Sequence, residues 1–117
     1  MSEVINVYGL LGTRALVTRE AAQRLGPAIA ASLARKADQV ALDFSQTLGI
    51  TPSFLDELLR VVQDSLRDSG IMQVRLKLKN PPTRLSLKFM ALARGRGVRL
   101  AEADGDTWLI AVESPTG

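Results

Sequence analysis

An apolar run at residues 40–44, with the sequence VALDF, most constrains how this chain can fold. A nearly unbroken apolar run of this length is typical of a strand that is covered on both faces. Thr51 and Pro52 then predict the start of a helix, because threonine is a good N-cap and proline fits the first helical position. Apolar residues recur at helical spacing through Leu66, and Gly70 can close the helix as a left-handed cap. A buried strand followed by an amphipathic helix predicts an α/β domain with a largely parallel sheet.

The segment before this unit predicts a further strand and helix. Residues 4–8 (VINVY) are rich in β-branched and aromatic side chains, and residues 15–17 could return beside them as a hairpin partner. Thr18 is placed to cap a helix whose apolar residues continue to position 33. Gly26-Pro27 interrupts this helix, and because an interior proline removes a backbone hydrogen bond, we expect a kink or a break there.

The second half of the chain continues the alternation of strands and helices. Apolar and basic residues alternate through residues 72–79, which predicts a strand with one wet face that lies toward the sheet edge. A helix is expected over residues 82–93. The sequence DGD predicts a hairpin turn between strands at 98–103 and 107–112, and residues 114–117 are expected to fray.

Composition excludes several classes of chemistry. The chain has 117 residues, which corresponds to one domain over residues 1–117. It contains no cysteine and no histidine, so it lacks disulfides, thiolate nucleophiles and the commonest zinc ligand and general base. It has neither a transmembrane run of about 18 apolar residues nor the features of a signal peptide. We therefore expect a cytoplasmic protein that is not an enzyme and uses no metal or cofactor.

Basic residues are concentrated in one part of the sequence. Residues 71–101 contain eight lysines and arginines and no acid, whereas residues 1–70 have a net charge of −1. Such a segment is either a docking surface for something anionic or the solvated side of amphipathic elements. Binding of nucleic acid or another anionic ligand is therefore an alternative function, with Arg75, Lys77, Lys79, Arg84 and Lys88 as its candidate residues. Aromatic residues do not interleave with these bases, which disfavours single-stranded nucleic acid.

The connection between residues 43 and 53 is the main candidate site. It runs from the carboxyl end of a buried strand to a helix N-terminus, where ligands bind in open α/β sheets. The free N–H groups of the helix start suit a phosphate or a carboxylate, and Ser53 falls within the first turn. Thr51 and Ser53 could instead only cap the helix, since Ser53 and Asp56 resemble a capping box. Both interpretations can hold together.

The acidic residues near this loop do not predict a catalytic site. Asp56 and Glu57 occupy adjacent helical positions that point about 100° apart, so they do not readily share a metal or a proton with each other or with Asp43. They are expected to form a solvated helix face. A nucleophilic Ser53 would need a lysine or a carboxylate as its base, because histidine is absent.

Two segments resemble a known family. Residues 40–59 (VALDFSQTLGITPSFLDELL) and residues 18–22 (TREAA) resemble the STAS-like family of small bacterial proteins, which is similar to the STAS domains of anti-sigma factor antagonists. The resemblance implies a mixed, mostly parallel sheet of four or five strands, with helices packed chiefly on one side. The C-terminal hairpin stands where those antagonists usually have a last helix.

The resemblance also implies a partner and a switch. In the antagonists, a serine at the start of this helix is phosphorylated by an anti-sigma factor that is also a kinase. Ser53 falls on that serine, whereas Pro52 and Phe54 replace its neighbours. The implied function is a regulatory module that docks on an anti-sigma factor or kinase-type ATPase. Its contact residues would be Asp43, Thr51, Ser53, Phe54, Asp56 and Glu57.

Assembly with a second copy is a further expectation. A strand at residues 72–79 that lay at the sheet edge could pair two copies of the chain in a homodimer, because an edge strand leaves its backbone N–H and C=O groups unpaired.

Overall fold

The computed structural model describes residues 2–70 and 74–112. These residues form a five-stranded sheet in the order β1-β3-β5-β7-β6 and a two-stranded sheet of β2 and β4. Strands β1, β3 and β5 are parallel, whereas β7 runs antiparallel to both β5 and β6. The elements are β1 (Ser2–Asn6), α1 (Val7–Leu11), β2 (Ala15–Leu16), α2 (Arg19–Gln23), α3 (Gly26–Ala34), β3 (Gln39–Asp43), β4 (Gly49–Ile50), α4 (Pro52–Ser69), β5 (Arg75–Lys79), α5 (Leu87–Gly95), β6 (Val98–Ala103) and β7 (Thr107–Val112).

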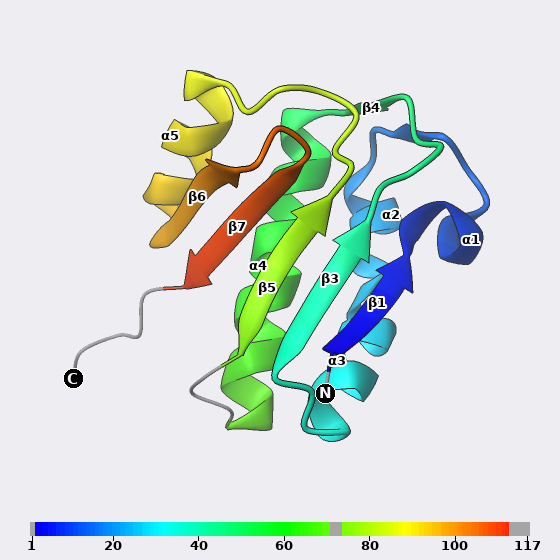
Figure 1. Ribbon diagram of the computed structural model, residues 1–117, viewed down its shortest axis with the longest axis vertical. Coiled ribbons are helices and arrows are strands. Elements are labelled where there is room, and N and C mark those ends of the chain that lie inside the picture. The colour runs from blue at the N-terminus through cyan, green and yellow to red at the C-terminus, as the bar shows by residue number, and fades with distance from the viewer. Residues whose placement is uncertain (1, 71–73, 113–117) are drawn as a thin grey trace.

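The helices lie chiefly on one side of the large sheet (Figure 1). This arrangement and the β6–β7 hairpin confirm the predicted α/β fold with a mixed, mostly parallel sheet. The core lies between the sheet and α4, where Leu42 of β3 and Leu58 and Leu59 of α4 are all buried, as the apolar stripe predicts. None of the helices in the described ranges is long and apolar enough to cross a membrane.

The other face of the sheet is not covered by these helices, and we call it the open face. Leu76 and Leu78 of β5 point into the core, so Arg75, Lys77 and Lys79 lie on the open face. Strand β5 is hydrogen-bonded on both sides, to β3 and to β7. The prediction that this strand lies toward the sheet edge is therefore wrong, and a homodimer cannot form by edge pairing of β5. The alternation reflects the missing helical layer.

Strand β3 also has only one face under the helices. Val40 and Leu42 belong to the core, whereas Ala41 between them faces the open side. Ala41 is only 1% exposed, because a small side chain in a central strand is covered by its neighbours. The central residues of β3 are therefore buried on both faces, as the apolar run predicts, although helices cover only one of these faces.

The N-terminal segment differs from the predicted hairpin. Strand β1 ends at Asn6, whose Oδ1 atom accepts a hydrogen bond from the Gly9 N–H at 2.6 Å and caps α1. The segment at β2 then pairs in parallel with β4 instead of returning beside β1. Local side-chain capping thus converts the end of the predicted strand into a short helix.

The helix boundaries follow local signals. Thr18 caps α2, which ends at Gln23, and α3 begins at Gly26 with Pro27 in its first turn, which confirms the predicted break. Gly70 closes α4 in the left-handed conformation, as expected. The last helix begins later than predicted, because Ser86 accepts a hydrogen bond from the Phe89 N–H and serves as its N-cap. The predictions for residues 72–73 and 114–117 lie outside the described residues.

Candidate functional site

The loop between β3 and α4 brings the carboxyl end of a central strand to the start of the longest helix. Residues 14–17 brace this loop from the side. The Leu48 N–H donates to the Arg14 carbonyl at 2.8 Å, and the Thr51 N–H donates to the Leu16 carbonyl at 3.1 Å. The Thr47 hydroxyl donates to the Phe44 carbonyl at 2.5 Å within the loop. These hydrogen bonds therefore hold the start of α4 in place.

Thr51 alone caps the start of α4. Its hydroxyl oxygen accepts a hydrogen bond from the Phe54 N–H at 3.2 Å, and its hydroxyl donates to the Val17 carbonyl at 3.2 Å. Ser53 lies in the first turn with its side chain exposed to solvent. Because Thr51 is the N-cap, capping does not explain the serine at position 53.

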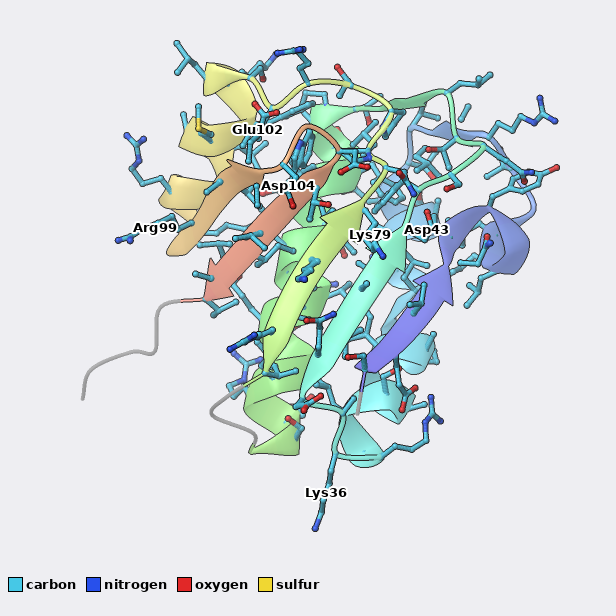
Figure 2. The ribbon with its side chains drawn as sticks, in the orientation of Figure 1. Lys36, Asp43, Lys79, Arg99, Glu102 and Asp104 are labelled. Atoms are coloured by element: carbon cyan, nitrogen blue, oxygen red, sulfur yellow. The ribbon has the colours of Figure 1, made fainter. Side chains whose placement is uncertain are left out.

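Asp43 ends β3 in a compact polar cluster. Its Oδ1 atom accepts hydrogen bonds from the Ser45 N–H at 3.0 Å, the Ser45 hydroxyl at 2.7 Å and the Asn80 amide at 3.0 Å. Burial opposes ionisation of the Asp43 carboxyl, but the hydrogen bonds from Asn80 and Ser45 outweigh it and lower the pKa. Figure 2 shows Asp43 and Lys79 at neighbouring strand ends, where they are register partners. The cluster fixes the loop beside α4.

Asp56 is held by two arginines from other elements. Arg96 donates from Nε to Oδ1 at 2.6 Å and from Nη2 to Oδ2 at 3.1 Å, and Arg19 donates to Oδ2 at 2.7 Å. The bidentate hydrogen bonds from Arg96, followed by the hydrogen bond from Arg19, lower the pKa of Asp56 to about 2. Asp56 thus links α4 to α2 and to the turn after α5.

Glu57 is buried, with 5% of its surface exposed. Its Oε2 atom accepts hydrogen bonds from Arg60, one turn along α4, and from the Gln23 amide at 2.8 Å. Hydrogen bonds from Arg60 and then Gln23 lower the pKa of Glu57 to about 2. The prediction that Asp56 and Glu57 form a solvated helix face is therefore wrong, because arginines and a glutamine from α2, α4 and the turn after α5 satisfy both carboxylates.

The predicted contact residues thus divide into accessible and committed side chains. Ser53 is exposed, and Asp43, Thr51 and Asp56 are half-buried. Phe54 is fully buried in the core and Glu57 is nearly so. A partner could touch Ser53 directly, whereas the side chain of Phe54 is not available to it.

The arrangement does not favour acid–base chemistry. Carboxylates with a pKa of about 2 are weak bases at neutral pH, so Asp56 and Glu57 are unsuited to activate the Ser53 hydroxyl. Among the residues that the structure describes, no three acidic side chains gather closely enough to hold a metal ion. What the site offers is an exposed hydroxyl at a fixed helix N-terminus.

The basic segment is divided between different parts of the fold. Three of its candidates, Arg75, Lys77 and Lys79, line up along β5 on the open face. Arg84 lies in the exposed loop before α5, and Lys88 is exposed on α5, which packs on the opposite side of the sheet. The five residues therefore do not form one continuous surface.

Comparison with known families identifies part of the chain. Residues 21–81, more than half of the sequence, match a family model described as a STAS-like domain of unknown function. The matched span runs from α2 through β5 and includes Asp43, Ser53 and all of α4. No curated protein and no solved structure matches the chain.

Proposed function

Because the chain belongs to the family of STAS-like domains of unknown function, we propose that it is a non-catalytic regulatory module that binds a protein partner through the start of α4. The partner is an anti-sigma factor or a kinase-type ATPase, as for the anti-sigma factor antagonists that the sequence resembles. The contact surface centres on Ser53 and extends to Asp43 and Thr51.

One observation supports this proposal most directly: Ser53 is exposed, whereas the side chains near it in the sequence make contacts within the fold. Thr51 supplies the helix cap, Phe54 fills the core, and Asp56 is bonded to two arginines. The side chain of Ser53 makes no hydrogen bond with the residues that the structure describes, and it lies on a helix start that the β2–β4 pairing braces. A rigid, exposed hydroxyl suits recognition by a protein surface.

Phosphorylation of Ser53 would act as a switch on this surface. A phosphate adds a charge of about −1.5 to −2, and the N-terminal end of the helix dipole stabilises a negative charge. The domain would therefore stay folded. A partner surface built for a neutral hydroxyl would have to bury that charge without a counterion, at a cost of several kcal/mol. Phosphorylation would therefore release the partner.

The test is affinity capture with three forms of the chain as bait: the parent, Ser53→Ala and Ser53→Asp. A lysate of the cells that encode the chain is passed over each form, and bound proteins are identified by mass spectrometry. We expect an anti-sigma factor or kinase-type ATPase on the parent and on Ser53→Ala, and at least tenfold less of it on Ser53→Asp. Recovery of no such protein, or equal recovery on all three baits, contradicts the proposal.

A further inference from the structure

The open face of the sheet carries a regular pattern of charge. Arg75, Lys77 and Lys79 lie in one column along β5, the central strand. Side chains on one face of a strand recur every two residues, so the Cα atoms that carry these three cations are spaced about 6.6 Å apart. The middle cation, Lys77, is half-buried and forms no ion pair with any of the described residues.

Apolar side chains flank the middle of this column on both sides. Ala41 of β3 and Leu109 of β7 are the register partners of Lys77, so they stand next to it across the sheet. Leu109 is 39% exposed, and Val4, the next residue in the same row on β1, is 60% exposed. In Figure 1 the face turned toward the viewer is this one, with α3, α4 and α5 behind the sheet. The open face thus combines a central cationic column with apolar residues in the row of its middle cation, whereas Asp43 stands beside Lys79 at one end.

We propose that the open face binds an amphipathic helix of a partner protein, with acidic residues at positions i, i+4 and i+8. Such a helix rises about 1.5 Å per residue, so its acids recur about every 6 Å and match the spacing of the cations on β5. A helix is about 10 Å wide, and two strand spacings are also about 10 Å. An apolar residue beside the acids would then reach the exposed side chain of Leu109. The bound helix would supply the layer that the sheet lacks.

Other occupants fit this face less well. Bases of single-stranded nucleic acid need aromatic side chains to stack on. Four aromatic residues are buried in the core and are not available on the open face: Phe44, Phe54, Phe89 and Trp108. The remaining aromatic residue of the described ranges, Tyr8, belongs to α1. A second copy placed face to face would bring two cationic columns together, which like-charge repulsion disfavours.

Lys77, at the centre of this surface, lies away from Ser53, although Asp43 of the proposed Ser53 surface stands beside Lys79 at one end of the column. Ser53 lies in the first turn of α4, which packs on the covered side of the sheet, whereas Lys77 is on the opposite side. Loss of one interaction therefore leaves the other measurable.

The test uses a displayed library of 18-residue helical peptides, randomised along one face and selected on the folded chain. The selected peptides are titrated against the parent, Lys77→Glu, the matched charge reversal Lys88→Glu on α5, and Ser53→Asp. We expect acids at i, i+4 and i+8 in the selected peptides. Lys77→Glu should weaken their binding at least tenfold, and Lys88→Glu and Ser53→Asp less than twofold. An oligothymidylate of 20 nucleotides serves as the nucleic-acid probe.

Several results would overturn the proposal. These are a selection that yields no binder, selected peptides without an excess of acids, and binding that Lys77→Glu leaves unchanged. Tighter binding of the oligothymidylate than of the selected peptides would assign the face to nucleic acid instead. A melting temperature of Lys77→Glu equal to that of the parent would show that the variant is folded.

Discussion

The first two turns of α4 contain two kinds of polar side chain. Ser53 is exposed, whereas Asp56 and Glu57 bond to arginines and a glutamine from packed elements. All three residues are polar, so the sequence alone suggests that all three are exposed to solvent. The difference shows that polarity in a helix does not establish exposure, because a charged residue can be enclosed when opposing charges pack around it. We assign recognition of a partner to Ser53, the exposed residue of the three.

The largest expected effect on stability is at the buried face of α4. Leu58→Ala removes a fully buried side chain and should lower the free energy of unfolding by about 2–5 kcal/mol. Leu87→Ala is the matched control, since Leu87 is 81% exposed, and it should change stability by less than about 0.5 kcal/mol. Urea unfolding measures both variants. Equal midpoints for the two would show that the packed face of α4 is misplaced.

A smaller loss is expected at the carboxylates. Glu57→Gln keeps the shape of the side chain but weakens its hydrogen bonds with Arg60 and Gln23. We expect a loss of about 1–3 kcal/mol, typical of a hydrogen bond to a charged group. Glu102→Gln, at an exposed position of β6, should have little effect in the same denaturation experiment. A Glu57→Gln variant as stable as the parent would show that these hydrogen bonds do not stabilise the fold.

The same carboxylates predict how stability depends on pH. The pKa values of Asp56 and Glu57 are about 2 in the folded chain, below their ordinary values near 4. A carboxyl whose pKa is lowered by folding stabilises the fold above its unfolded pKa, and this contribution is lost as the pH falls. Stability should therefore decrease between about pH 4.5 and pH 2. Thermal melting of Asp56→Asn/Glu57→Gln should show a shallower decrease, and an unchanged slope would contradict these assignments.

The smallest effect on stability is expected on the open face. Lys77→Glu and Lys79→Glu change charges that do not pack in the core, so each should alter the free energy of unfolding by less than about 0.5 kcal/mol. Chemical denaturation of the two single variants measures this. A loss of several kcal/mol would mean that the β5 column holds the sheet together and is not free to bind a partner.

Local signals in the sequence predict the fold well. The cap at Thr51, the break at Gly26-Pro27 and the hairpin around Gly105 each depend on residues only a few positions apart. Alternation along β5 correctly indicates one wet face. It cannot distinguish an edge strand from a central strand under a one-sided helical layer, because both leave one face in water.

The environment of the candidate site was less predictable. Arg96 lies 40 positions from Asp56, and Gln23 lies 34 positions from Glu57. No local pattern reveals such pairs, because the topology of the chain brings them together. The place of Ser53 in the first turn could be predicted, since it follows from the N-cap at Thr51.

The central claim is that Ser53 forms the recognition surface, and the most direct measurement is the affinity of charge variants for the captured partner. Ser53→Asp should weaken binding at least about tenfold, or roughly 1.4 kcal/mol, while its melting temperature stays within a few degrees of the parent. Ser86→Asp adds the same charge at the N-cap of α5 and is the matched control, with binding expected at the parent level. If Ser53→Asp binds as tightly as Ser86→Asp, the docking surface lies elsewhere and the account is contradicted.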